Sequence, residues 1–401
     1  MNFTKTKTTM PEDLVCLSHL RWGFVYQRPQ HLLSRFAKHQ RVFFVEEPVP
    51  TTGTPRIEIT RCPESGVYIC VPQMAEGLGR ASQDTILKLL LNNLLVEQKI
   101  TDYLLWYYTP MALSFSTHLQ PRLTVFDCMD ELSLFKGAPQ EMKDRESELL
   151  RRADLVFTGG QSLYEAKLGR HDDLHAFPSS IEYGHFVQAR TAQSDPADQA
   201  GIPHPRIGFC GVIDERMDLE LLGKAAQLRP DYHFVMIGPV VKIDPATLPR
   251  LDNIHYLGGK SYKELPQYLA GWDAAILPFA HNESTRFISP TKTPEYLAAG
   301  KPVVSTSITD VVRPYGAQKL VRIADTPEEF VTAIEQALVT DANDADWRVR
   351  VDAALSQNSW DLTHKRMCDL IESRILSREL EAARVTVTPT VPSISRAVLG
   401  D

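Results

Sequence analysis

Residues 289–306 read SPTKTPEYLAAGKPVVST, and this stretch indicates a helix between two buried strands. The apolar run from Ala274 to Phe279 reads as one parallel strand, and Pro302 to Ser305 reads as the next. Between the strands, Ser289 can cap a helix and Gly300 can end it. This strand–helix–strand unit is typical of a parallel α/β sheet.

Lys292 stands in the first turn of the expected helix, where the helix dipole disfavours a cation. An anion at the same place would offset this cost, because free backbone N–H groups at a helix start bind phosphate. Glu295 follows three residues later and shares a face with Lys292. This face therefore predicts a sugar-nucleotide site, with a cation for phosphate and a carboxylate for hydroxyl groups. A solvated surface pair is the alternative.

The segment resembles the C-terminal donor-site signature of GT-B glycosyltransferases, in particular the retaining family 4 and its relatives. The resemblance spans about Leu14 to Ser373 and is specific around residues 289–306. It implies that Glu295 holds the ribose hydroxyls of a nucleotide. The family has another glutamate eight positions earlier, where this chain has Phe287, so the residue that usually touches the donor sugar is missing or relocated.

A chain of 401 residues is too long for one ordinary core and favours two domains. Strands and helices alternate, which predicts two doubly wound, Rossmann-like α/β domains facing each other across a cleft, as in GT-B enzymes. The expected division is an N-terminal acceptor-side domain (1–187), a linker (188–205), a donor-binding domain (206–358), a C-terminal helix that packs back on the first domain (359–384) and a disordered tail (385–401).

The expected strands are 13–18, 41–46, 67–71, 103–107, 123–128, 154–158 and 174–177 in the first half. In the second half they are 206–211, 233–237, 254–257, 275–277, 302–305 and 320–323. Expected helices are 29–39, 86–99, 140–153, 162–169, 219–228, 262–272, 290–299, 327–339 and 360–384.

Composition excludes several functional classes. The net charge of −7, with acids and bases interspersed, offers no electrostatic case for nucleic-acid binding. The six cysteines are scattered without a C-x-x-C pair, as in a reducing compartment. No secretory signal or membrane-spanning run is recognisable. We expect a cytoplasmic protein, and peripheral contact with the inner face of the membrane through its acceptor stays open.

Glycines and one arginine follow the expected strands of the donor domain. Gly211 can let backbone approach a ligand, and Arg216 offers a planar fork for a diphosphate or, alternatively, a surface partner for Asp214. Gly238 ends the next strand, and Tyr262 could stack on the base or simply pack. The expected donor-binding residues are Gly211, Arg216, Gly238, Tyr262, Ser289, Pro290, Thr291, Lys292 and Glu295, with Pro290 at the first helical position.

An unusually aromatic loop follows the first expected strand. Exposed apolar loops often mark a binding surface, here for a glycan or lipid-linked acceptor. Packing of the aromatic side chains between the domains is the alternative. The expected acceptor-side residues are Arg21, Trp22, Gly23, Tyr26 and Arg28.

Several carboxylates end the strand at 123–128. Asp130 is the favoured general base and Asp127 the second candidate, because inverting GT-B enzymes place such a base in the N-terminal domain. Termination of the strand and capping of the next helix are the alternative roles. No expected nucleotide loop carries a metal-binding D-x-D arrangement, and the resemblance implies neither a cofactor nor a bound metal. A helix start, Lys292 and Arg216 would stabilise the leaving diphosphate.

These features predict a glycosyltransferase that moves a sugar from a nucleotide diphosphate to a hydroxyl acceptor, in bacterial surface polysaccharide or glycolipid synthesis. A GT-B-fold sugar-nucleotide epimerase and a degenerate, non-catalytic nucleotide-binding protein are the alternatives, the latter because of Phe287.

Overall fold

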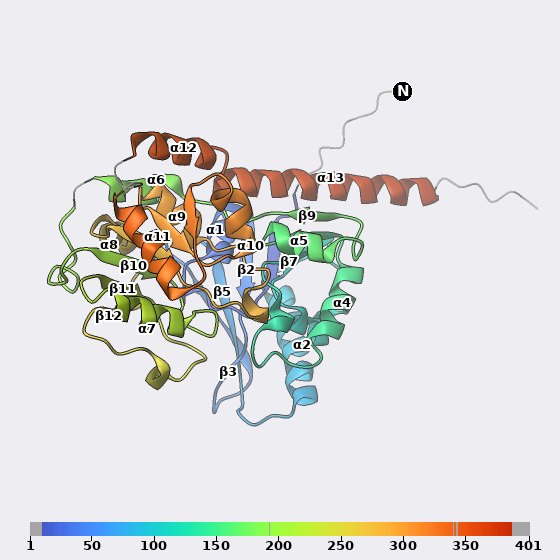
Figure 1. Cartoon of the computed structure of the whole chain (residues 1–401). Coiled ribbons are helices and arrows are strands. Elements are labelled where there is room, and N and C mark those ends of the chain that lie inside the picture. The colour runs from blue at the N-terminus through green and yellow to red at the C-terminus, as the bar shows by residue number, and fades with distance from the viewer. Residues whose placement is uncertain (1–9, 192, 340, 342–343, 387–401) are drawn as a thin grey trace, which may run out of the picture.

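The structure, a computed structural model, describes residues 10–191, 193–339, 341 and 344–386. Across these residues the strands form two separate sheets, one in each half of the chain (Figure 1). Apolar clusters lie on both faces of each sheet, under the covering helices. This is the two-sheet α/β fold that the alternating pattern predicts.

The strand order of the first sheet reverses at its central strand, β1 (Asp13–Leu17), because strands are added on both sides of it. β2 (Arg41–Val45) pairs with one edge of β1 and β6 (Tyr103–Tyr107) with the other, both in parallel. Every residue of β1 and β6 is buried, as in parallel strands covered on both faces. The order is β3-β5-β2-β1-β6-β7-β8-β9, with β3 (Val49–Pro50), β5 (Tyr68–Met74), β7 (Leu123–Cys128), β8 (Leu155–Thr158) and β9 (Leu174–Ala176).

The second sheet is built in the same way around β10 (Arg206–Cys210). β11 (His233–Ile237) and β13 (Ala274–Leu277) flank β10 in parallel. The order β12-β11-β10-β13-β14-β15 is that of a doubly wound nucleotide-binding sheet. Its outer strands are β12 (Ile254–Gly258), β14 (Val303–Ser305) and β15 (Val321–Ile323).

Helices connect the strands. In the first half they are α1 (Arg28–Phe36), α2 (Arg80–Glu97), α3 (Leu113–Ser116), α4 (Met142–Arg152) and α5 (Gln161–Lys167). α6 (Tyr183–Phe186) precedes the second half, which carries α7 (Leu219–Leu228), α8 (Leu265–Ala270), α9 (Lys292–Ala298), α10 (Thr309–Val311), α11 (Pro327–Val339) and α12 (Ala345–Leu355). In the part of the chain that the structure describes, no helix has the length and apolarity needed to span a membrane.

The last helix, α13 (Trp360–Thr386), returns to the first half and runs along it (Figure 1). Its buried face packs against α1, and both helices contribute to one apolar cluster of the first half. The α13 members of that cluster are Trp360, Met367, Ile371 and Ile375. Of the expected tail, residues 387–401 lie outside the described residues.

Every expected strand is present, but some elements differ from expectation. β4 (Arg56–Arg61) pairs antiparallel with β5 and was not predicted; it reads RIEITR, in which only Ile57 and Ile59 turn toward the apolar cluster of the first half. α12 and the short β3 were also not predicted. The expected helix 262–272 is a 3₁₀ turn, η5 (Tyr262–Glu264), followed by α8.

The start of α9 is a further correction. The helix begins at Lys292, and Thr291 occupies the capping position without a side-chain hydrogen bond. Ser289 is therefore not the cap, and its carbonyl oxygen accepts a hydrogen bond from the Ser179 hydroxyl at 2.7 Å. Gly300 lies just beyond the helix with a φ of 71°, as a terminating glycine should.

Candidate active site

A cleft lies between the two halves, at the carboxyl ends of β7, β8 and β10. Open α/β sheets bind ligands at this edge. The cleft has an empty volume of about 890 Å³, which includes the part open to solvent. The first half lines it with Val25, Tyr26, Gln27, Arg28, Met129, Asp130, Gly159 and Ser179, and the second with Phe209, Gly211, Val212, Arg216, Phe279, Ile288, Ser289, Pro290, Thr291 and Lys292.

Lys292 and Glu295 form an ion pair at the start of α9. Their side chains are only 15% and 5% exposed, so this is not the solvated surface pair considered above. Burial opposes the charge of the lysine, but the Glu295 carboxylate outweighs it and raises the pKa of Lys292. The two groups neutralise each other on the shared face that the sequence predicts.

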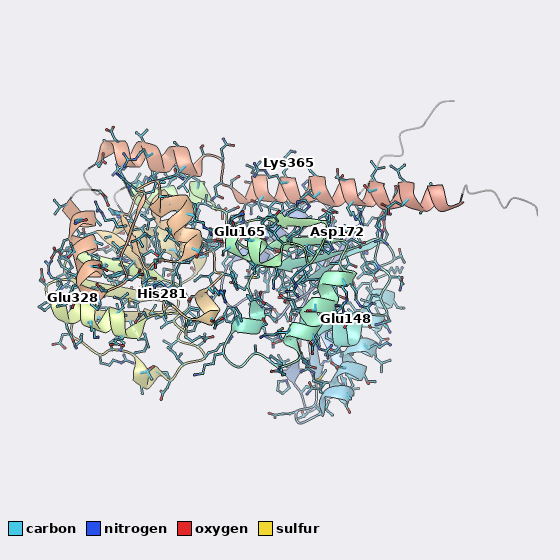
Figure 2. The ribbon with its side chains drawn as sticks, turned by 45° about the vertical axis from the view of Figure 1, so that its right-hand side comes forward. Glu148, Glu165, Asp172, His281, Glu328 and Lys365 are labelled. Atoms are coloured by element: carbon cyan, nitrogen blue, oxygen red, sulfur yellow. The ribbon has the colours of Figure 1, made fainter. Side chains whose placement is uncertain are left out.

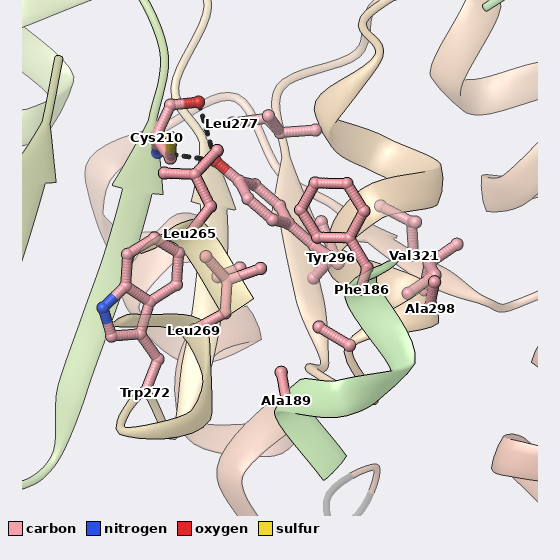
Figure 3. Packing of buried hydrophobic residues seen from close by; sticks show 14 of the residues in the cluster. Phe186, Ala189, Cys210, Leu265, Leu269, Trp272, Leu277, Tyr296, Ala298 and Val321 are labelled. Carbon is pink, nitrogen blue, oxygen red and sulfur yellow. Dashed lines mark hydrogen bonds between the residues drawn. The ribbon is translucent and has the colours of Figure 1, made fainter. Parts of the chain in front are cut away.

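Tyr296, the next residue of α9, fixes this helix against the second sheet. Its hydroxyl accepts a hydrogen bond from the Cys210 N–H at 2.6 Å and donates one to the Cys210 carbonyl oxygen at 3.2 Å (Figure 3). Tyr296 is fully buried beside Trp272. The helix start that carries Lys292 is therefore tied to the carboxyl end of β10.

Two glycines, Gly211 and Gly238, lie against each other directly after β10 and β11. Gly211 follows β10 and lines the cleft, as expected. Gly238 has a φ of 147°, and a Cβ built on it would lie 1.7 Å from the Gly211 carbonyl oxygen. Only glycine fits there. Gly238 is not part of the described cleft lining, so the expected direct contact is corrected to support of the Gly211 backbone.

Arg216 lines the cleft but already has a carboxylate partner. Its Nε lies 2.9 Å from Asp214 Oδ1 and its Nη2 lies 2.7 Å from Asp214 Oδ2. The guanidinium also lies 5.6 Å from the ring centre of Phe135, a residue of the first half. The pairing with Asp214 foreseen as the alternative is therefore present, although Arg216 still borders the cleft.

Asp130 follows β7 and reaches the cleft from the first half. Burial raises the pKa of Asp130 to about 6, against the opposing effect of the Arg216 and Arg28 guanidiniums. A carboxylate whose pKa lies near neutrality is suited to accept a proton near neutral pH. Asp130 therefore has both the position and the acidity expected of a general base.

Asp127 does not reach the cleft. It is completely buried, and its carboxylate accepts hydrogen bonds from Arg28 Nε at 3.0 Å and Nη2 at 2.8 Å. Arg28 Nη1 also donates to the Phe177 carbonyl oxygen at 2.8 Å. Asp127 therefore holds Arg28 in place, which corrects the expectation of a free carboxylate. Arg28 is itself buried, as the first residue of α1 rather than a loop residue.

The aromatic loop is held by Glu46 rather than left free. The Glu46 carboxylate accepts from Arg21 Nη1 at 3.0 Å and from the Trp22 N–H at 2.8 Å. The Trp22 ring packs edge-on against Phe44 in the core, so packing and not surface exposure explains this residue. Gly23 is exposed.

Tyr26 and Tyr262 stack on each other across the boundary between the halves. Their ring centroids are 4.4 Å apart with an interplanar angle of 23°. His185 stacks on Tyr262 as well, at 4.4 Å and 15°. The Tyr262 hydroxyl donates to Glu182 Oε2 at 3.1 Å. Tyr262 is therefore packed as the alternative reading expected, and no free face is left for a base.

Phe287 also bridges the two halves. It follows η6 (Glu283–Thr285) and packs against the apolar cluster of the first half. η6 contacts η2 (Leu132–Leu134), in the loop after Asp130. An aromatic side chain supplies no hydrogen bond to a sugar, and Phe287 packs in a contact between the two halves.

A second contact between the halves involves the start of α5. Asp310 Oδ1 accepts a hydrogen bond from the Ser162 N–H at 3.0 Å, although the two residues belong to different halves. Arg313 Nη1 lies 2.7 Å from Glu165 Oε2, and Figure 2 labels Glu165 on α5. The second half thus caps a helix of the first.

Comparison with known proteins agrees with this geometry. Residues 204–340 match the family model described as glycosyl transferases group 1. The candidate teichuronic acid biosynthesis glycosyltransferase TuaH of Bacillus subtilis is 27% identical over 276 residues, which are 63% of this chain and 68% of TuaH. This chain is a glycosyltransferase.

Solved structures place the glycosyltransferase in the GT-B fold. Sucrose-phosphate synthase from Thermosynechococcus elongatus superposes with a TM-score of 0.65 at 14% identity, covering 93% of this chain and 100% of that one. The E. coli trehalose-6-phosphate structure bound with UDP-2-fluoro glucose gives a TM-score of 0.65 at 13% identity, covering 89% and 98%. At these identities the likeness concerns the fold.

The glycosyltransferase gathers most of the predicted donor residues on one wall of the cleft and Asp130 on the other. Within the described chain, Glu295, Gly238, Tyr262, Asp127, Arg21, Trp22 and Gly23 are not part of the cleft lining. Sequence patterns did not reveal Tyr296, Asp310, Glu182 or His31, because their partners lie far away in the chain. His31 alone had a local signal, since it follows the aromatic loop in the run QRPQH.

Proposed function

We propose that this glycosyltransferase moves a sugar from a nucleoside diphosphate to a hydroxyl group of a cell-surface glycan or a lipid-linked acceptor. The observation that carries the proposal is the convergence of Lys292 at a helix start with Asp130 across one cleft. One side can stabilise a leaving diphosphate, and the other can receive a proton from an attacking hydroxyl.

The donor would bind to the second half. Backbone N–H groups at the start of α9 and the ammonium of Lys292 would meet the phosphates. When the donor binds, the Glu295 carboxylate would break its ion pair with Lys292 and accept hydrogen bonds from the ribose hydroxyls. Arg216 is a weaker candidate for phosphate, because Asp214 already neutralises it.

Asp130 would take the acceptor proton if the reaction inverts the anomeric configuration. A retaining reaction needs no dedicated base, and Asp130 would then hold a hydroxyl group of donor or acceptor. Phe287 stands where the family has a glutamate and cannot bind a sugar hydroxyl. Asp130 borders the same cleft from the first half and would supply a carboxylate instead.

The relatives support the choice of substrates for a first assay. TuaH is named for teichuronic acid biosynthesis, which supports a surface polysaccharide acceptor. One structural neighbour binds UDP-2-fluoro glucose, which supports a uridine diphosphate sugar as the first donor to test. Contact with the membrane would follow only from a lipid-linked acceptor.

The deciding experiment is a transfer assay with UDP-sugars and extracted surface glycan or lipid acceptors, with product anomers assigned by NMR. We expect acceptor-dependent release of the nucleoside diphosphate. Turnover of the sugar nucleotide without any acceptor would instead indicate an epimerase. Tight nucleotide binding with neither reaction would indicate a non-catalytic protein.

A further inference from the structure

A buried ion cluster lies directly behind the loop that carries Asp130. Lys167, the last residue of α5, pairs with the carboxylates of Glu131 and Glu146. Arg170 joins the cluster from its outer side, with Nη1 at 3.3 Å from Glu146 Oε2. Burial opposes the charge of the ammonium, but nearby acidic side chains outweigh it and raise the pKa of Lys167. Lys167 is therefore charged at neutral pH, although it is not part of the described cleft lining.

Stability alone does not account for this cluster. The side chains of Lys167 and Glu146 are only 2% and 7% exposed, so both charges have left water. Such burial is costly, and apolar residues of similar volume often give an equally stable core. A buried charge does fix the place of its partners, because moving one charge leaves the other uncompensated. This favours a role of the cluster in geometry.

The residue that the cluster fixes most directly is Glu131, which follows Asp130 in the chain. Glu131 Oε2 accepts a hydrogen bond from the Lys167 ammonium, and Oε1 accepts one from the Ser133 hydroxyl at 2.8 Å. The Leu132 N–H donates to the Asp130 carbonyl oxygen at 3.1 Å, which closes a tight turn. A shift of the Asp130 backbone would therefore pull Glu131 away from Lys167.

A small cavity also connects the cluster with the proposed base. Asp130, Ser133 and Glu146 all line this cavity, together with apolar residues of the first half. The cavity has room for about one water molecule. The ion cluster and Asp130 are therefore neighbours in space as well as along the chain.

The helix that carries Lys167 is held at its other end by the second half of the chain. Asp310 Oδ1 accepts a hydrogen bond from the Ser162 N–H at the start of α5. α5 has seven residues, which makes it about 10 Å long. A helix this short moves as one body, so a contact with the second half at its start also places Lys167 at its end.

We propose that Lys167 is a positioning residue for Asp130 and that α5 links it to the contact between the halves. Lys167 holds Glu131, and through Glu131 it holds the loop with the proposed base. This inference rests on the proposed function and deepens it. Asp130 takes up its working position only while Asp310 holds α5 against the second half.

The test is a double-mutant cycle on the full chain, in which the rate of transfer is measured at saturating UDP-sugar with extracted acceptors. The double variant Glu131→Gln/Lys167→Met removes two charges at similar volume and leaves Glu146 to Arg170. It should transfer about 10- to 100-fold more slowly, because a small misplacement of a reacting group is enough for such a loss. The Kd of uridine diphosphate, measured by calorimetry, should not change.

The decisive comparison repeats these substitutions in Asp130→Asn. There they should change the rate by less than about twofold, because the residue through which they act is already disabled. Asp310→Ala should behave in the same way, slowing the enzyme with Asp130 but not the Asp130→Asn variant. A substitution that merely destabilises the fold would reduce the rate by the same factor in both backgrounds.

Two further variants serve as controls. Glu131→Gln alone keeps an oxygen that can accept from Lys167, so it should retain at least about a third of the wild-type rate. Arg170→Met removes the outer member of the cluster, whose side chain is 38% exposed and pairs with Glu146. It should leave the rate within about twofold of the wild type.

The inference is overturned if Glu131→Gln/Lys167→Met transfers at the wild-type rate, or if its loss is equally large in Asp130→Asn. An Asp310→Ala loss that persists in Asp130→Asn overturns the link through α5. The proposed function fails differently. In that case the wild type transfers no sugar to any acceptor, or Asp130→Asn is as active as the wild type.

Discussion

In the described chain, the ion pair with Glu295 is the salt bridge recorded for Lys292, and Glu295 is buried while Lys292 is only 15% exposed. Replacing one of them leaves an uncompensated charge, which costs about 3–5 kcal/mol of stability. A single substitution therefore confounds folding with ligand binding. The double variant Lys292→Met/Glu295→Gln removes both charges at similar volume.

We expect the double variant to unfold in urea within about 1–2 kcal/mol of the wild type, whereas each single variant is less stable. Nucleoside diphosphate affinity should nevertheless fall by at least about 1.5–3 kcal/mol, because charge-assisted hydrogen bonds to phosphate and ribose are lost. Undiminished affinity in the double variant would contradict the donor-site assignment.

Asp130 is expected to set the acid limb of the pH profile. Its pKa is raised to about 6, so a base at this position is protonated and inactive at lower pH. The value of kcat/KM should rise with pH and level off above about 6, and Asp130→Asn should abolish the limb. If the reaction inverts, the rate should also fall by about 10²–10⁴. A limb that persists in Asp130→Asn would place the base elsewhere.

The same shift has a consequence for stability with a defined sign. The folded pKa of Asp130 lies above the ordinary 3.8, so the folded state holds the proton more tightly than the unfolded state. Stability from this group is present below pH 4 and is lost as pH rises through 6. Asp130→Asn should therefore be more stable than the wild type at pH 8, by on the order of 1–3 kcal/mol, and equal to it at pH 4. Urea titrations at the two pH values provide the measurement.

The helix α5 depends on a residue of the other half. Asp310 caps its first N–H groups, and Gly160 leaves room for that carboxylate, since a Cβ on Gly160 would lie 2.3 Å from Asp310 Oδ2. Asp310→Ala and Gly160→Ala disturb the contact from opposite sides. Each should reduce stability by about 0.5–2 kcal/mol and increase the radius of gyration measured by X-ray scattering.

Arg313→Ala is the control for this contact. Its ion pair with Glu165 bridges the same elements, but the side chains are 55% and 43% exposed. Exposed pairs contribute at most about 1 kcal/mol, so neither stability nor dimensions should change much. An unchanged radius in Asp310→Ala would show that this contact does not hold the halves together.

The elements that could be predicted from sequence are those with a strong local pattern. β6 and β13 are uninterrupted apolar runs, β1 and β10 are apolar after one charged residue, and Gly300 marks the end of α9. β4 was missed because its alternation rests on only two apolar residues, Ile57 and Ile59, between charged ends, and its pairing with β5 is not visible in the sequence.

In the candidate site, residues whose partners are distant in the sequence could not be predicted. The position of Lys292 and Asp130 at the cleft could be predicted, because Lys292 lies at a helix start and Asp130 follows a strand end. Asp127 was misplaced because its partner, Arg28, is 99 residues away and nothing local indicates their pairing. Tyr26 was assigned to the acceptor side because only the folded chain brings it to Tyr262.

The packing of α13 on the first half depends on its first residue, Trp360. Trp360 is 1% exposed and stacks on His31 at 4.6 Å. Trp360→Ala should shift the urea midpoint to a lower concentration, with a loss of about 3–5 kcal/mol. Leu380→Ala on the same helix is the control, since Leu380 is 53% exposed and should change stability by less than about 0.5 kcal/mol. Equal effects of the two substitutions would show that Trp360 has no special role.

The polypeptide passes between the halves twice, and the two passages lie against each other. Ser180 Oγ and Thr363 Oγ1 are 2.7 Å apart, and the Trp360 N–H donates to the Ile181 carbonyl oxygen at 3.4 Å. Paired passages of this kind restrict sliding and twisting, and leave one rotational degree of freedom about a local axis. When one half rotates relative to the other, residues far from that axis must then move farther than residues close to it. Spin labels placed near Phe135 and Lys242 should separate on opening, while labels beside Ser180 and Thr363 keep their spacing.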